Sequence, residues 1–233
     1  RPKRTGDKTL SVRTVPKKGY KGIRLFPKLT NESIPEEWEL DSVESLLQII
    51  DYRGRTPHFS EKGVVHLRSN NIRDNKINFD NITFVSNETY EKYMTRGIPK
   101  ENDILFTTEG PLGESAMVPK SFLFSLAQRV IVLRPKTSNL DSKFLKFLLD
   151  SKIIKKRYEA LATGTTLAGI SSKWFRKLKL ILPPLPEQQK IASILSNVDN
   201  LIQNTDKLIE KTTQLKKGLM QELLVKGIGH TKF

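Results

Sequence analysis

Arginine, asparagine and glutamine gather in three short segments of this chain, each beside small or apolar residues. In the polar segment 51–57, Arg53 and Arg55 flank Gly54, and Tyr52 precedes them. A guanidinium group can bind a phosphate, or the O6 and N7 atoms of guanine, and a tyrosine hydroxyl can hydrogen-bond a phosphate. The segment therefore predicts contact with nucleic acid, although a solvated turn has the same composition.

Two further segments carry side chains that can recognise bases. Arg68, Asn70 and Asn71 follow an apolar run, and Gln128 and Arg129 precede another. The amide of Asn or Gln matches the N6 and N7 atoms of adenine. Asn is also a common loop residue, and a structural hydrogen bond or a phosphate contact suits Gln128 and Arg129 equally well, so these uses stay open.

Other polar residues extend this set. Thr165 and Thr166 lie between glycines and suit either backbone phosphates or a helix cap. Lys173 opens a basic cluster that includes Trp174, whose ring we expect in the core. The residues for which we predict DNA contact are Tyr52, Arg53, Arg55, Arg68, Asn70, Asn71, Thr108, Glu109, Gln128, Arg129, Thr165, Thr166 and Lys173.

Motifs of catalysis are absent from the sequence. It contains no Gly-x-x-x-x-Gly-Lys phosphate loop, no Gly-x-Gly-x-x-Gly and no Gly-x-Ser-x-Gly. With no cysteine, a thiol nucleophile and a cysteine-based metal site are excluded, and the three histidines have no ligand spacing. The Asn-Pro-Pro-aromatic motif of amino-methyltransferases is missing because Leu182 precedes Pro183-Pro184. We expect a chain that recognises rather than catalyses, without a metal or cofactor of its own.

The composition favours an anionic partner. The chain of 233 residues has a formal net charge of +15, which points first to nucleic acid and second to an anionic membrane. Ten of the 40 Lys and Arg residues lie in residues 1–28, beside one acid, Asp7. No apolar run is long enough to span a membrane and no signal peptide is visible, so we expect a soluble, cytoplasmic protein.

Hydrophobic patterning predicts a mixed α/β domain followed by one long helix. Residues 1–33 indicate a flexible basic arm, used for DNA contact or only for solubility. Residues 34–182 alternate short apolar runs with turn residues, which is typical of short strands, and Asp141 is the expected N-cap of an amphipathic helix that extends to residue 161. Residues 183–229 begin with a proline-rich block and continue as a heptad repeat.

The heptad repeat indicates a coiled coil. With Ile191 at position a, the apolar a and d residues are Ile191, Ile194, Val198, Leu201, Leu208, Leu215 and Leu219. A strict seven-residue period over several heptads imposes a left-handed supercoil with a partner helix. Thr205 and Thr212 are polar a positions, which favour a fixed register or partner choice. The alternative is a core helix of an ordinary bundle.

Several blocks of the sequence resemble the specificity subunit of type I restriction–modification enzymes. They are GTTLAGIS at 164–171, LKLILPPLPEQQKI at 178–191 and LKKGLMQ at 215–221, with weaker matches at 51–57, 67–72, 102–113 and 127–129. The resemblance covers residues 34–229. It implies a target recognition domain and one long helix, which together form half of a full subunit.

The resemblance also implies partners. In such proteins each recognition domain reads one half of a split DNA site, and two long helices pair antiparallel to set the gap. Modification (methyltransferase) subunits, which bind S-adenosylmethionine, and restriction subunits assemble on them. The specificity subunit itself performs no chemistry.

The sequence contains one such unit, so we expect either a piece of a longer subunit or a half subunit that self-associates through the helix. Two other hypotheses remain: the recognition part of a fused restriction–methylation enzyme, and a coiled-coil adaptor that binds protein. The target bases cannot be deduced from the sequence.

Overall fold

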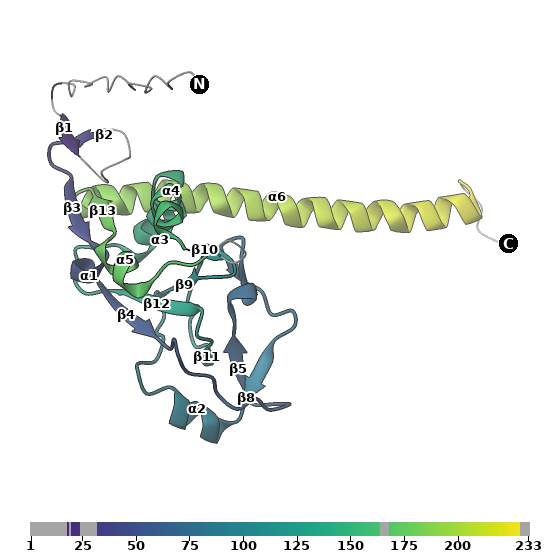
Figure 1. Cartoon of the computed structure of the whole chain (residues 1–233). Helices are drawn as coiled ribbons and strands as arrows, with labels where there is room; N and C mark the ends of the chain where they lie inside the picture. The colour runs from purple at the N-terminus through teal and green to yellow at the C-terminus, as the bar shows by residue number, and fades with distance from the viewer. Residues whose placement is uncertain (1–17, 19, 24–31, 164–167, 229–233) are drawn as a thin grey trace, which may run out of the picture. The chain divides into compact units, whose positions relative to one another are not determined.

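The computed structural model describes residues 18, 20–23, 32–163 and 168–228. By its internal contacts the chain divides into two compact units, Arg1–Gln188 and Gln189–Phe233. The boundaries predicted at residues 33 and 182 stay predictions. The architecture is the predicted mixed α/β domain followed by a long helix (Figure 1).

Thirteen strands and six α-helices are assigned in the described residues. The strands are β1 (Tyr20–Ile23), β2 (Glu32–Pro35), β3 (Glu39–Ser42), β4 (Leu47–Asp51), β5 (Val64–Leu67), β6 (Ile72–Arg73), β7 (Lys76–Ile77), β8 (Thr83–Val85), β9 (Ile104–Thr108), β10 (Leu112–Met117), β11 (Phe124–Leu126), β12 (Val130–Pro135) and β13 (Lys179–Leu182). The helices are α1 (Val43–Leu46), α2 (Asn87–Tyr93), α3 (Ser142–Asp150), α4 (Lys152–Leu161), α5 (Ser172–Lys177) and α6 (Leu185–Lys226), with a 3₁₀ turn at Ser69–Asn71.

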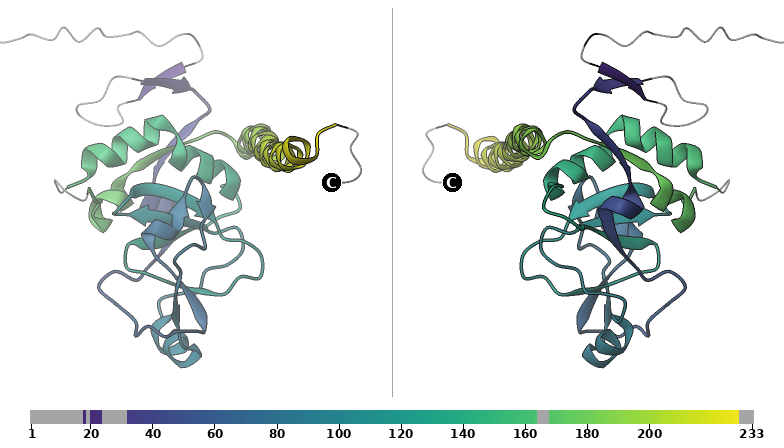
Figure 2. Two further views of the ribbon diagram at one scale, coloured as in Figure 1. Left: turned by 90° about the vertical axis from the view of Figure 1, so that its right-hand side faces the viewer. Right: turned by 90° about the vertical axis from the view of Figure 1, so that its left-hand side faces the viewer.

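A four-stranded antiparallel sheet in the order β10-β9-β12-β4 forms the centre of the first unit. Strand β9 and residues 130–133 of β12 are buried on both faces, which explains their uninterrupted apolar sequences. A second sheet, β11-β5-β8, lies on one side of the central sheet together with α2, and α3 and α4 lie on the other (Figures 1 and 2).

The two faces of the central sheet carry separate apolar layers. Leu105 and Val132 face a cluster with Leu67 and Phe124 of the second sheet and Tyr93 of α2. On the opposite face, the Phe106 ring lies edge-on to Tyr158 of α4 at 5.6 Å and beside Phe175 of α5 at 5.0 Å. The alternation of strand side chains therefore fixes α2 and the second sheet on one side and α4 and α5 on the other.

Glycine is required at position 113 of β10. Its φ is +84°, and a side chain there would collide with the Tyr158 ring. The Tyr158 hydroxyl donates to the Gly113 carbonyl at 3.3 Å, so α4 is seated against the backbone of the strand. This close approach is possible only without a Cβ atom.

The helix predicted from Asp141 to residue 161 is two helices. Asp141 is the N-cap, as predicted, and accepts from the Phe144 amide at 2.8 Å. Ser151 adopts extended angles (φ −64°, ψ 144°), ends α3 and caps α4 through its hydroxyl. A serine between two helical runs offers its own hydroxyl as a cap, so the chain can turn there without leaving amides unsatisfied.

Three other expectations differ from the structure. Tyr20–Ile23, part of the predicted flexible arm, forms β1 and pairs with β2. Residues 112–114, whose glycine and glutamate are typical of a loop, belong to β10. Trp174 on α5 is 46% exposed, so its assignment to the core is wrong.

The proline- and glutamine-rich segment 183–189 leads into α6 and is held in place by one buried side chain, that of Gln188. Gln188 donates to the carbonyls of Pro183 and Asn139 at 2.8 and 3.1 Å and accepts from the Asp141 amide at 3.0 Å. The Trp38 indole donates to Glu187 at 3.0 Å. Pro183 and Pro184 precede the helix and Pro186 lies in its first turn, as predicted, where a proline loses no helical hydrogen bond.

Within the second unit, helix α6 carries an exposed apolar stripe. Leu201, Leu208 and Leu215 are each more than 60% exposed in the isolated chain. The hydroxyls of Thr205 and Thr212 donate to the carbonyls four residues earlier, at 2.9 and 2.8 Å. Both polar a positions are therefore satisfied inside their own helix and need no polar partner on another.

Candidate nucleic-acid interface

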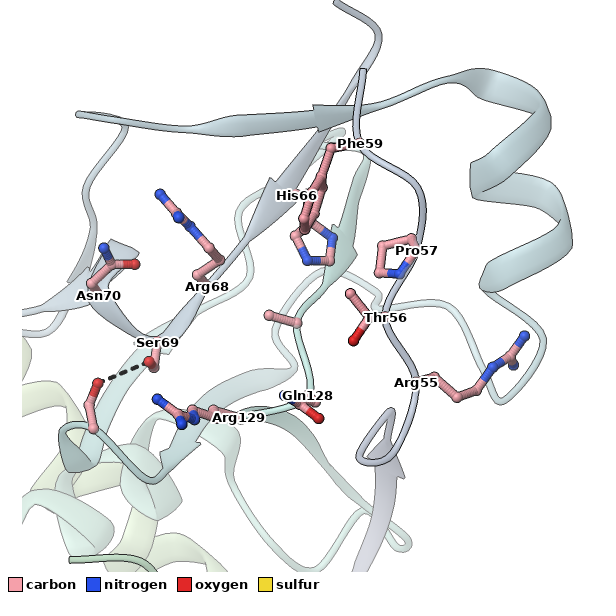
Figure 3. A pocket seen from close by; sticks show the side chains of 12 residues that line it. Arg55, Thr56, Pro57, Phe59, His66, Arg68, Ser69, Asn70, Gln128 and Arg129 are labelled. Atoms are coloured by element: carbon pink, nitrogen blue, oxygen red, sulfur yellow. Dashed lines mark hydrogen bonds between the residues drawn. The ribbon is translucent and has the colours of Figure 1, made fainter. Parts of the chain in front are cut away.

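Two adjoining cavities open on the first unit where strands β4, β5 and β9 end and β12 begins. The first, of about 400 Å³, is lined by Arg55, Thr56, Pro57, Phe59, His66, Arg68, Ser69, Asn70, Gly110, Ala127, Gln128 and Arg129 (Figure 3). The second, of about 500 Å³, is lined by Arg53, Gly54, Thr108, Glu109, Gln128, Arg129, Thr163, Gly169, Ile170 and Ser171. They share Gln128 and Arg129, so they form one continuous surface, the double cavity.

Eight of the thirteen predicted residues line the double cavity. They come from four segments far apart in the sequence, and the pairing of the central strands β4, β9 and β12 brings three of these segments together. The eight are Arg53, Arg55, Arg68, Asn70, Thr108, Glu109, Gln128 and Arg129. Whether they contact DNA stays a prediction.

Each arginine of the double cavity is held by an acceptor of the protein. Arg53 donates to Asp51 at 2.6 and 2.8 Å and to the Ile170 carbonyl at 3.3 Å. Arg55 donates to the Thr95 hydroxyl at 2.9 Å and lies over the Tyr93 ring. These bonds leave other guanidinium N–H groups for a ligand, since each guanidinium has five.

Arg68 and Arg129 are placed by a carbonyl and a carboxylate. Arg68 donates to the Asn81 carbonyl at 2.7 Å. Arg129 lies 3.3 Å from the Glu109 carboxylate, and both side chains are partly exposed. A half-exposed pair of this kind adds little stability, so its main effect is to limit the orientations of the Arg129 guanidinium.

Asn70 and Gln128 are the exposed amides of the double cavity. Neither side chain makes a hydrogen bond within the described part of the chain. Both amides can therefore form their full set of hydrogen bonds with a ligand.

Three of the predicted residues are buried, and their polar groups bond the protein. Tyr52 is fully buried: its hydroxyl donates to the Gly97 carbonyl at 2.9 Å and accepts from the Arg96 amide at 2.8 Å. Asn71 is 1% exposed, and its amide binds the backbone of the 68–80 loop. Thr108 is 3% exposed, and its hydroxyl donates to the Arg129 carbonyl at 3.3 Å. Their polar groups shape the loops that carry the exposed residues.

Two other predictions have different outcomes. Thr165 and Thr166 lie outside the described residues. Lys173 is exposed on α5 and lines neither cavity.

Phe59 and His66 also line the first cavity, although the sequence did not predict them as site residues. His66 is 2% exposed, and its Nδ1 lies 2.8 Å from the Ser125 hydroxyl. Burial, and then the charge of Arg68, lower the pKa of His66 from 6.5 to about 4, so the ring is uncharged at neutral pH. His66 occurs two residues before Arg68, on the same side of the strand, which was an available signal. Phe59 gave none, because an aromatic residue in a loop has no pattern.

A family model described as the type I restriction modification DNA specificity domain matches residues 35–214. The chain belongs to this family. The match includes both the double cavity and most of α6, so the fold and the predicted family agree.

Relatives and solved structures of this family are similar to the chain. The specificity subunits of the type I restriction enzymes MjaX and MjaVIII of Methanocaldococcus jannaschii are 31% and 29% identical, each over 87% of this chain, and 49% and 45% of their own lengths. The S subunit of a type I restriction–modification system from M. genitalium has a TM-score of 0.55 at 21% identity, covering 86% of this chain and 47% of that one. The HsdS subunit from Thermoanaerobacter tengcongensis has a TM-score of 0.54 at 18% identity, covering 87% and 46%. The chain thus spans about half the length of the relatives it matches.

Among the described residues, no helix combines the length and the apolar character needed to cross a membrane.

Proposed function

We propose that this chain reads one half of a split DNA site, as a recognition module of a type I restriction–modification specificity subunit. The observation that carries the proposal is the double cavity, where four arginines and two exposed amides meet on a chain of net charge +15. Arginine suits phosphate oxygens and guanine edges, and the amides suit adenine. The surface therefore combines groups that position DNA with groups that distinguish bases.

The arginines are suited to this role because they are already oriented. Arg53 and Arg55 each hydrogen-bond a protein acceptor and Arg129 forms an ion pair with Glu109, which limits the rotamer freedom that binding would otherwise remove. An oriented guanidinium can discriminate between bases, whereas a flexible cation contributes mainly to general affinity for the backbone.

Helix α6 sets a distance in this proposal. Its 42 residues extend about 63 Å at ~1.5 Å per residue, and the stripe of Leu201, Leu208 and Leu215 is exposed along it. We propose that this stripe pairs antiparallel with a second long helix, from another copy of this chain or another recognition module. The pair would hold two recognition domains at a fixed spacing.

The proposed role is recognition without catalysis. Methylation would come from modification subunits, which bind S-adenosylmethionine, and cleavage from restriction subunits. The names of the relatives as specificity subunits support this division of work.

Binding to duplex DNA at several salt concentrations tests the proposal. Arginine contacts to phosphates release counterions, so log K should fall steeply with log salt. In the complex with modification subunits, Arg68→Ala and Arg129→Ala should each lower the magnitude of the slope by about one. Lys143→Ala, an exposed cation of α3 that lines neither cavity, is the matched control and should leave the slope unchanged. Binding that does not depend on salt, or on these arginines, would refute the proposal.

A further inference from the structure

The first cavity is concave, and a protein surface that reads a DNA groove does not need a concave site. DNA grooves are themselves concave, so proteins read them with projecting helices, ribbons or loops. A cavity of about 400 Å³ on the DNA-facing surface can instead receive only a group that projects from the duplex. Two such groups exist: the sugar–phosphate ridge, and a nucleotide turned out of the stack.

The lining of this cavity favours a base over a phosphate. The Phe59 ring is 56% exposed and meets the buried His66 ring edge-on at 5.4 Å. Pro57 and Ala127 add apolar surface (Figure 3). Aromatic side chains stack on bases of any kind, whereas the apolar surface of Phe59, Pro57 and Ala127 offers a phosphate no hydrogen bond.

Polar side chains that line the cavity can bond the edge of a base and the phosphates beside it. Asn70 and Gln128 are exposed amides that line this cavity, and both can bond the polar edge of a base. Arg68 and Arg129 also line the cavity and suit the phosphates on either side of an extruded nucleotide. An exposed aromatic ring, two exposed amides and three arginines thus line one cavity.

We propose that the first cavity receives a single nucleobase turned out of the duplex, stacked on Phe59 and bonded at its edge by Asn70 or Gln128. This inference rests on the proposed function, because it takes the double cavity as the DNA-facing surface. It assigns Phe59 as the stacking residue of this cavity and Asn70 and Gln128 as the residues that would distinguish bases. The recognition domain would then hold a base by itself, separately from any base that a modification subunit handles.

Scanning the recognised half-site with mismatches tests this inference. The half-site is first taken from the modified positions in the genome of a host carrying the complete system. Each base pair is then replaced by a mismatch, and affinity is measured for the complex of the chain with its modification subunits. A base that must leave the stack does so more easily when unpaired, so at one position other than the modified base a mismatch should tighten binding about tenfold.

The variant Phe59→Ala should reduce that gain to less than about twofold, since the stacking surface is lost. Phe79→Ala is the control: Phe79 is also half-exposed, at 50%, but lines neither cavity, and the tenfold gain should remain. Equal thermal midpoints for the two variants would show that both fold. If no position responds outside the modified base, or if Phe59→Ala keeps the response, the inference is overturned while the proposed function stands. If the complex does not prefer the half-site to a scrambled duplex, the proposed function itself fails.

Discussion

At the scale of residues, the arginines of the double cavity illustrate how orientation is obtained without burial. Arg53 is tied to Asp51 through three of its atoms and remains partly exposed. Arg129 and Glu109, which both line the second cavity, lie 3.3 Å apart. Such half-exposed pairs contribute about 0–1 kcal/mol to folding, so their contribution is geometric rather than stabilising.

His66 makes the stability of the first unit depend on pH. Its pKa is lowered from 6.5 to about 4 in the folded state, chiefly by burial, with Arg68 adding to the effect. As pH falls through 6.5, the unfolded chain takes up a proton that the folded chain does not bind. Stability is therefore fully present above pH 6.5, is lost as pH falls to about 4, and declines by at most about 3 kcal/mol through this residue.

Urea unfolding of the full chain between pH 7 and pH 4 measures this loss. His66→Asn, which keeps a polar atom near the position of Nδ1, should lower stability at pH 7 but flatten its decline with pH. His58→Asn, at an exposed histidine, should leave the decline as it is. An unchanged slope for His66→Asn would show that carboxylates alone cause the acid sensitivity.

Residue types indicated where a binding surface would form, but not which side chains reach it. The sequence predicts the same DNA-contacting role for Arg68, Asn70 and Asn71, which lie in one polar segment. Asn70 is nevertheless exposed, whereas Asn71 is 1% exposed. The difference arises because the 3₁₀ turn Ser69–Asn71 directs Asn71 inward, where it bonds three backbone groups. A turn of this kind depends on the partners of a whole loop, which single-sequence patterns do not contain.

At the scale of elements, α6 is the part of the fold that the sequence predicted best. A seven-residue period over many residues is a strong signal, and the prolines before it fix where the helix begins. Short elements were harder to predict from the sequence. Strand β10 carries Gly113 and polar Glu114 and Ser115, so its sequence resembles a loop. It is a strand because β9 pairs with it and α3 covers it.

The stripe of α6 should be what holds two long helices together. Leu201→Glu with Leu208→Glu places two charges at d positions that are each more than 60% exposed in the isolated chain, and the proposed pairing would bury them without partners. We expect self-association at tens of micromolar to be abolished, as measured by size exclusion with light scattering.

The matched control adds the same two charges elsewhere. Gln203→Glu with Gln214→Glu lies outside the a, d and e positions of the heptad and should retain the mass of the unmodified chain. Equal masses for both double variants would contradict the register, and a monomeric unmodified chain would exclude self-pairing.

At the scale of the whole molecule, the chain combines the double cavity, which we propose binds DNA, with helix α6, which we propose sets the distance between two recognition domains. The length of α6 gives a quantitative prediction for the gap between the two halves of the recognised site. Deleting residues 205–211 removes one heptad and keeps the stripe in phase, but shortens the helix by about 10.5 Å at ~1.5 Å per residue. At ~3.4 Å per base pair, the gap between the halves of the recognised site should shrink by about three base pairs while both halves keep their bases.

Mapping modified bases in a host that carries the deletion measures the gap. An unchanged gap would show that something other than α6 sets the spacing. Loss of all modification would not distinguish unfolding from misplacement, so the mass of the complex is determined on the same variant.

Mapping modified bases for the unmodified system and for Asn70→Ala with Gln128→Ala tests the central claim most directly. Both side chains are exposed in the double cavity and make no hydrogen bond within the described residues, so the variant should fold and assemble normally. The account predicts a split motif in the unmodified system. If this chain contributes one of two different recognition modules, its half of the motif becomes degenerate in the variant while the other half and the gap stay the same; if two copies of this chain pair, both halves relax alike. An undivided motif, or a motif that keeps every base in the variant, would contradict it.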